Sequence, residues 1–501
     1  RLFVGRASDV YKRQTLQRME LLKTGYMGTL SLGWDNYLFL ELTGRQERSS
    51  TLKDQSFFYP SANLSFLFTQ AFHMPSWWNY GKLRLSYGIV GNAPETYTAN
   101  IVYEQGSDNG FTWNTIPSSW GNADIRPEKK YEYEIGLESK FLNNRLGIDV
   151  SYYNNRVKDQ ILSTPQPSTS GVKNVLMNVG EVANHGWDIS ISATPILTRD
   201  FRWDLTANYG VYKNKVVKLA DGVPYLEILN SGGSGIKIQA VEGQPMGDIY
   251  AQVPQVNENG EYLVSDKGLY LNQTELQKVG NINPAGVGGL FNSFSYKNVF
   301  LDFSIDFRIG GDVINEMNQY ATAVGLTPES LKYRDTEHGG LSYYYPGDNN
   351  SSGIPVQVDP STGVGPNGEI IYHDGIILPG VVASTGERNT RIIPAGYYYN
   401  TTYNWGTEAE QLTYRHSVFD NSYVKLRELT IGYQFPEKMI SKLGLGRLSV
   451  SVFGRNLFYF YKALKNYDAE SSVGTSWANQ ATVGSSTTAT RSFGVSLRAS
   501  F

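Results

Sequence analysis

Apolar and polar side chains alternate strictly along the last residues of the chain, Arg491 to Phe501. Phe493, Val495 and Leu497 fall on one face of this segment, and small or charged residues fall on the other. A period of two predicts a β-strand with one apolar side. In a soluble protein an uncovered apolar strand is an aggregation hazard. In an outer-membrane barrel the apolar face meets lipid and the polar face meets the lumen, so the pattern predicts a barrel strand.

The same alternation recurs in further segments along the chain. These segments are joined in turn by short turns and long connections, as barrels require. We expect further strands at 24–34, 37–45, 58–69, 82–90, 131–138, 146–153, 187–193, 201–209, 289–296, 301–307, 423–435 and 448–461. The predicted fold is therefore all-β, a transmembrane antiparallel β-barrel with roughly thirteen strands in this chain. Asp35-Asn36 predicts a tight hairpin, residues 436–446 have room for one short helix, and Trp77 and Trp78 suit an interfacial belt.

One predicted strand breaks its own pattern. In the segment YVKLRELTIGYQF, Leu429 and Ile431 lie on one face, but Val424 and Leu426 lie on the other. Either a β-bulge near Arg427 shifts the register, or Val424 and Leu426 face the lumen above the lipid. The sequence leaves both alternatives open.

Composition agrees with a barrel and excludes several other classes. Aromatic residues make up 13% of the chain, Gly occurs 51 times, and no run of about 18 apolar residues predicts a membrane helix. The absence of Cys excludes disulfides, thiolate metal sites and a Cys nucleophile. A net charge of −3 gives no reason to expect nucleic acid as a partner.

Charged residues of both signs fall on the face that we predict to be the lumen. Such a face indicates a wide interior that is wet or plugged, and the alternative for any single residue is a structural ion pair on the wall. These residues are Glu41, Arg45, Arg84, Glu132, Glu134, Asp149, Asp188, Arg202, Asp204, Asp302, Asp306 and Arg308.

The first residues lack the strand pattern. Residues 1–14 are basic, contain no apolar core of a signal peptide and resemble translated adapter sequence. We expect them to be a non-native leader, with a genuine polar loop as the alternative, and residues 15–501 to be a partial barrel domain. Because single-chain bacterial barrels have even strand counts, the odd count also predicts truncation at the N-terminus.

Several ordered segments resemble a specific family. The stretches FFYPSANLSFLF, GKLRLSYGIVGN, NVGEVANHGWDISISATPI, FDNSYVKLRELTIGYQFP and GRNLFYFYK, together with the run from Asp124 to Leu162, are similar to SusC/RagA-type TonB-dependent transporters of Bacteroidetes. The resemblance implies a barrel of about 22 strands, preceded by a plug and a TonB box that this chain lacks.

The resemblance also implies a function and partners. It implies TonB-dependent uptake of oligosaccharides or peptides across the outer membrane, with a SusD-like surface lipoprotein as a lid, the TonB complex as the energy source and outer-membrane lipid around the barrel. A passive porin and an outer-membrane enzyme with a site on the barrel rim are the alternatives. Covalent chemistry, a cofactor and a bound metal are not expected.

The candidate chemical residues are sparse. No His lies in a metal-binding spacing, and His373-Asp374 is the nearest approach to a catalytic pair. Residues 256–266 and 359–369 are similar to calcium loops but lack the regular ligand series.

Aromatic residues in the long connections are the better ligand candidates, because flat rings stack on sugars or hold peptide side chains. The alternative is that they pack the loops or contact the lid protein. The candidates are Trp113, Trp120, Tyr343, Tyr344, Tyr345, Tyr398, Trp405 and Trp477.

Overall fold

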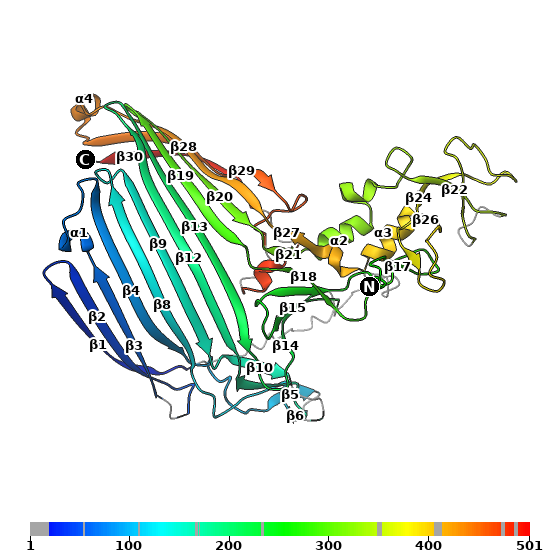
Figure 1. The fold of residues 1–501 in the computed structure, drawn as a ribbon, viewed down its shortest axis with the longest axis horizontal. Coiled ribbons are helices and arrows are strands. Elements are labelled where there is room, and N and C mark those ends of the chain that lie inside the picture. The colour runs from blue at the N-terminus through cyan, green and yellow to red at the C-terminus, as the bar shows by residue number, and fades with distance from the viewer. Residues whose placement is uncertain are drawn as a thin grey trace, which may run out of the picture.

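The computed structural model describes residues 20–53, 56–108, 111–165, 169, 171–231, 235–347, 353–404, 413–471, 476–484 and 489–500. Its main feature is a curved, 13-stranded antiparallel sheet in which chain order is also spatial order (Figure 1). The strands of this sheet are β1 (Lys23–Trp34), β2 (Leu38–Ser49), β3 (Ser56–Phe66), β4 (Trp78–Asn92), β8 (Glu128–Phe141), β9 (Leu146–Lys158), β12 (Glu181–Leu197), β13 (Phe201–Lys218), β19 (Gly286–Tyr296), β20 (Val299–Ile309), β28 (Tyr423–Gln434), β29 (Arg447–Lys462) and β30 (Ser492–Ser500).

Each of the thirteen predicted strands is confirmed, although several differ in length from the prediction. The largest change at any one end is in β13, which continues to Lys218 instead of ending at residue 209. The strand β3 ends early at Phe66, because Phe68 begins the short helix α1 (Phe68–Ala71). The expected helix between β28 and β29 is also present as α4 (Glu437–Ile440). None of the helices among the described residues is long and apolar enough to cross a membrane.

Short turns join the strands at one end of the sheet, where Figure 1 shows α1 and α4. The predicted hairpin at Asp35-Asn36 is confirmed, and both residues adopt positive φ angles of 46° and 58°. Positive φ at both central residues matches the right-handed twist of the two flanking strands. In barrels the short turns lie on the periplasmic side, so the opposite end of these strands is the extracellular end.

The outward face of the sheet is apolar, and the cross-strand pairs show how it is built. Leu301, Ile431 and Val452 occupy one rung across β20, β28 and β29. Ile431 is 48% exposed and Val452 is 54% exposed, as expected for side chains that face lipid. At the periplasmic end the rings of Trp77 and Trp78 stack 6.0 Å apart, which agrees with the predicted interfacial belt.

The register conflict in β28 is resolved by a β-bulge at Arg427. The pairing partners of β28 on β20 shift between Ser304 and Ile305, so Arg427 is left as an extra residue. As a result Leu426 pairs with Ile305 on the outward face, as Leu429 does with Phe303. The first alternative is therefore confirmed, and the second, in which Val424 and Leu426 face the lumen, is wrong.

Within the apolar belt of the outward face, the polar side chain of Asn292 makes a hydrogen bond that can be tested. Asn292 of β19 shares a rung with Leu205 and Phe303, is 8% exposed, and accepts a hydrogen bond from Trp203 Nε1 at 3.1 Å. We expect Trp203→Phe to lower the free energy of unfolding by about 1–3 kcal/mol, because it leaves a buried amide oxygen unpaired. Equilibrium unfolding in detergent measures this loss. In an Asn292→Leu background the same substitution should cost less, and an equal cost would contradict the bond.

The long extracellular connections fold into units of their own. Figure 1 shows them gathered beyond one end of the sheet, with β22 and β24 projecting away from it. Their elements are β5 (Glu104–Asp108), β6 (Phe111–Thr115), β7 (Ser119–Trp120), β10 (Ile161–Pro165), β11 (Asn174–Asn178), β14 (Tyr225–Ser231), β15 (Ile236–Val241), β16 (Asp248–Ala251), β17 (Leu263–Val264), β18 (Gln277–Asn281), β21 (Asp312–Ile314), α2 (Glu316–Ala323), η3 (Pro328–Leu331), β22 (Leu341–Tyr344), β23 (Val356–Gln357), β24 (Tyr372–Ile376), β25 (Val381–Val382), β26 (Ile393–Pro394), α3 (Ala395–Tyr403), η4 (Tyr414–Ser417), β27 (Val418–Asp420) and η6 (Asn479–Ala481), while η5 (Ser441–Leu443) follows α4 at the other end.

Most of the buried apolar residues lie in these extracellular units. Ile236, Ile249 and Ile314 are fully buried in one cluster that joins β15, β16 and β21. The strand β17 of one long connection pairs in parallel with β25 of the next, at Leu263 and Val381. Two connections that are far apart in sequence therefore form one structure at the extracellular end.

Candidate functional site

The inner wall of the sheet carries an ion-pair cluster in its periplasmic half. Arg84 of β4 shares a rung with Gly136 of β8 and Ser151 of β9. Its guanidinium lies across Gly136, where a Cβ would be only 2.7 Å from Nη2. The same nitrogen donates to Asp149 at 2.7 Å and to Ser151 at 3.0 Å, and Nη1 lies 3.6 Å from Glu138. One arginine thus links three strands across a glycine that leaves room for it.

Other predicted lumen charges are also paired along the wall. Arg45 donates to Glu47 at 2.5 Å, and Arg202 donates to Asp204 at 2.5 Å. For Arg45, Arg202 and Asp204 the structure shows the alternative that the sequence left open, a structural ion pair on the wall. Such pairs balance part of the charge on the inner wall.

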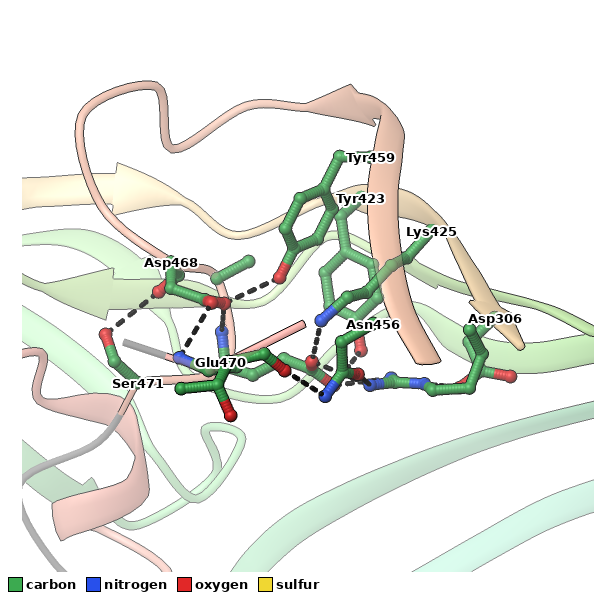
Figure 2. A network of polar contacts seen from close by, with 12 residues as sticks. Asp306, Tyr423, Lys425, Asn456, Tyr459, Asp468, Glu470 and Ser471 are labelled. Carbon is green, nitrogen blue, oxygen red and sulfur yellow. Dashed lines mark hydrogen bonds and ion pairs between the residues drawn. The ribbon is translucent and has the colours of Figure 1, made fainter. Parts of the chain in front are cut away.

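The most connected polar network lies at the extracellular end, where the last long connection meets the wall (Figure 2). Arg427, the bulge residue, donates through Nε to Asp306 of β20 at 2.6 Å. Its two terminal nitrogens hold both carboxylate oxygens of Glu470, at 2.5 Å and 2.8 Å. Lys425 Nζ donates to the same carboxylate at 2.5 Å and is only 2% exposed. We refer to Asp306, Lys425, Arg427 and Glu470 as the mouth network.

The charge state of Glu470 follows from this setting. Burial raises the pKa of its carboxyl, but the hydrogen bonds from Arg427 and Lys425 outweigh burial and bring the pKa down to about 2. Next to it, Asp468 accepts a hydrogen bond from the Tyr459 hydroxyl at 2.6 Å and one from the backbone N–H of Glu470 at 3.0 Å. The connection between β29 and β30 is therefore fastened to the inner wall through two acidic side chains.

Sequence reasoning did not single out Lys425, Arg427 or Glu470 as site residues. The usable signal was the change of alternation at Arg427, because a bulge can place an extra side chain on the lumen face. Glu470 gave no signal, since it lies in a connection without periodicity, and it meets Arg427 across a separation of 43 residues.

The predicted aromatic residues lie in different parts of the extracellular end. Trp113 on β6 is 45% exposed, and Trp120 on β7 is half-buried with its ring 6.5 Å from that of Tyr103. Trp477 is 37% exposed and lies against Gly247. Figure 1 shows β6 and β22 well apart, so these residues do not form one site.

The tyrosine candidates lie in the projecting unit. Tyr343 and Tyr345 are 1% and 4% exposed, with their rings 5.5 Å apart, and burial of this degree favours loop packing for these two. Tyr344 and Tyr398 are half-buried, and the ring of Tyr398 lies 5.1 Å from that of Tyr399. Trp405 lies outside the described residues. Contact between any of these aromatic residues and a substrate stays a prediction.

His373 and Asp374 form hydrogen bonds with different residues. His373 Nδ1 lies 2.8 Å from Ser342 Oγ, whereas Asp374 accepts a hydrogen bond from the Tyr343 hydroxyl at 3.0 Å. Successive residues of a strand point to opposite sides, so Asp374 does not orient the histidine ring. Ser342 is 1% exposed, which leaves no approach for a substrate in this conformation.

The calcium-like loops satisfy their own acidic side chains. Glu369 accepts backbone hydrogen bonds from Asn367 and Gly347, and Asn257 donates to Glu261 at 3.0 Å. Within the part of the chain that the structure describes, no group of three or more His, Cys, Asp or Glu side chains could hold a metal ion.

Comparisons with known proteins agree with this architecture. Residues 5–255 match the family model described as TonB dependent receptor-like, beta-barrel. TonB-dependent receptor P3 of Formosa agariphila is 24% identical over 417 residues, which is 76% of this chain and 35% of that protein. TonB-dependent receptor SusC of Bacteroides thetaiotaomicron is 30% identical over 247 residues, 45% of this chain and 24% of that protein.

A solved structure shows the same fold. The structure of the RagAB peptide transporter superposes with a TM-score of 0.63 at 19% identity and covers 88% of this chain and 44% of the other. The chain spans about a third of the length of the curated relatives that it matches over most of its own length. A polar inner wall, an apolar outward face and the family match agree, so the chain belongs to the TonB-dependent receptor-like β-barrel family of the outer membrane.

Proposed function

We propose that residues 15–501 form part of the barrel wall of a TonB-dependent importer for oligosaccharides or peptides. The observation that carries this proposal is the combination of a wide polar wall with folded extracellular units above it. A barrel with such a wall has room for solutes larger than those that pass through small filled barrels. The solved structure with the same fold is named a peptide transporter, which supports the peptide class.

The proposed partners are a SusD-like surface lipoprotein at the extracellular mouth and the TonB complex on the periplasmic side. The projecting unit with β22, β24 and α3 offers the lipoprotein a structured surface. The exposed aromatic residues Trp113 and Trp477 are the candidates for substrate contact in this arrangement. Passive diffusion and a catalytic site on the rim are the competing functions.

A strain that lacks the complete gene tests the proposal. Growth is measured on a panel of defined oligosaccharides and peptides, and we expect one class to support growth only when the gene is restored. Uptake of that labelled substrate should fall to background when TonB is removed, because an importer of this kind needs energy coupling. Uptake that persists without TonB would instead support a passive porin, and a product altered at the cell surface would support an enzyme.

A further inference from the structure

On the outward face of β8, β9, β12 and β13, apolar side chains give way to cationic side chains beyond a row of aromatic rings. Tyr133, Tyr152 and Trp187 lie side by side, with ring centroids 6.4 Å and 4.9 Å apart. Trp187 pairs with Val211, and these residues share the outward face with Ile135 and the apolar residues below. Aromatic girdles of this kind mark the level at which a barrel leaves the hydrocarbon. The row therefore marks the extracellular interface of the membrane.

Cationic side chains follow directly beyond this row on the same outward face. Directly paired residues in a sheet project to the same side, so the strand registers place Lys213 and Lys215 on the outward face. A register shift between Glu181 and Val182 then pairs Lys218 with Glu181. Three successive rungs across β9, β12 and β13 are Asn154–His185–Lys213, Arg156–Ala183–Lys215 and Lys158–Glu181–Lys218, and Lys129 of β8 pairs with Lys158. We refer to Lys129, Arg156, Lys158, Lys213, Lys215 and Lys218 as the basic collar.

The positive charge of the basic collar is only partly compensated. Arg156 lies 3.1 Å from Glu181, and Lys218 lies 3.3 Å from Asp221. Lys213 and Lys215 are exposed, and no carboxylate in the described parts of the chain forms an ion pair with either of them. The inner wall differs, because cations such as Arg84 and Arg202 are held by carboxylates there. The outward face thus presents excess positive charge at the level of Lys213 and Lys215.

We propose that the basic collar binds the phosphate groups of lipid headgroups in the outer leaflet. The collar continues the lipid-facing surface without a break, so headgroups are the molecules that lie against it at this height. Flexible lysine side chains can follow phosphates that differ in position, and the small Ala183 separates Arg156 from Lys215 along their rung. A pocket of about 530 Å³ lined in part by Lys158, Glu181 and Lys218 adjoins the third rung.

The test measures lipid binding by the complete gene product purified in detergent. The probe is diphosphorylated lipid A in mixed micelles, compared with the same lipid after enzymatic removal of its phosphates. We expect Lys213→Gln/Lys215→Gln to weaken binding of phosphorylated lipid A about 25-fold, because each lysine near an anionic lipid surface contributes roughly fivefold. The matched control Lys130→Gln/Arg202→Gln removes two positive charges that are paired with Glu132 and Asp204 on the inner face, and it should bind as the wild type does.

Several results would overturn the proposal. Equal binding of phosphorylated and dephosphorylated lipid by the wild type would exclude phosphate recognition, and equal affinity of the collar variant and the wild type would exclude these lysines. Lys213→Arg/Lys215→Arg keeps the charge and should keep binding, so a loss that appears in this variant as well would indicate altered folding and contradict the charge mechanism. None of these measurements depends on transport, so failure of the proposed import function would be seen separately.

Discussion

Replacing Glu470 by glutamine is expected to lower the free energy of unfolding by about 3–5 kcal/mol, the usual cost of breaking a buried ion pair. Glutamine keeps the size of the side chain but removes its charge, so Lys425, which is 2% exposed, loses its carboxylate partner. Arg427 loses the same partner and, among the described residues, keeps Asp306 as its anionic contact. Urea titration of the complete gene product in detergent measures this change in the free energy of unfolding.

The matched control is Glu428→Gln, one residue beyond the bulge arginine. Glu428 pairs with Arg455 at 3.0 Å, but the two side chains are 39% and 57% exposed. Solvent screens such a pair, so its removal should cost less than about 1 kcal/mol. If both variants lost the same stability, the mouth network would not hold the last connection in the way that its geometry indicates.

The pH dependence of the Glu470 effect has a definite sign. The pKa of Glu470 is about 2 in the folded protein, compared with about 4.3 for a glutamate in an unfolded chain. Between these values the unfolded state binds more protons, so stability rises with pH. The contribution is therefore complete above about pH 5 and is lost as the pH falls towards 2. The difference between wild type and Glu470→Gln should be large at pH 7 and clearly smaller at pH 3.

The sheet could be predicted from the sequence because the alternation of apolar and polar residues in each strand shows which side chains share a face. Along β12, Trp187, Ile189 and Ile191 alternate with polar residues, and lipid on one side and water on the other keep this alternation strict. The position of the bulge in β28 could also be located, because Val424 and Leu426 broke the alternation. Whether Val424 and Leu426 face lipid or the lumen could be decided only from their pairing partners on β20.

The extracellular units could not be predicted in the same way, because their stability depends on contacts between distant segments. The parallel pairing of Leu263 with Val381 leaves no periodic trace in either connection. For the same reason the tyrosine run at Tyr343 gave no indication that two of its rings lie in a buried cluster. The mouth network was missed because its central carboxylate, Glu470, belongs to a connection whose path is set by the wall.

Replacing Ile191 by arginine is expected to lower the free energy of unfolding by about 2–4 kcal/mol, the cost of a cation on the lipid face near the middle of the bilayer. Ile191 lies on the outward face of β12 between Ile148 and Ala207 and is 37% exposed. Trp187 at the extracellular level and Trp203 towards the periplasmic turns place Ile191 near the middle of the apolar belt. Unfolding in lipid vesicles gives the difference directly.

The neighbouring residue supplies the control, because successive residues of a strand face opposite sides of the sheet. Ser190 faces the inner wall and pairs with Asp149 and Asn208, so an arginine at this position meets water and a carboxylate. Ser190→Arg should change the stability by less than about 0.5 kcal/mol, as surface substitutions usually do. If Ser190→Arg were the more damaging variant, the two faces would be reversed and lipid would lie on the side that carries the ion pairs. If both variants behaved like wild type, the outward face of β12 would not lie in hydrocarbon.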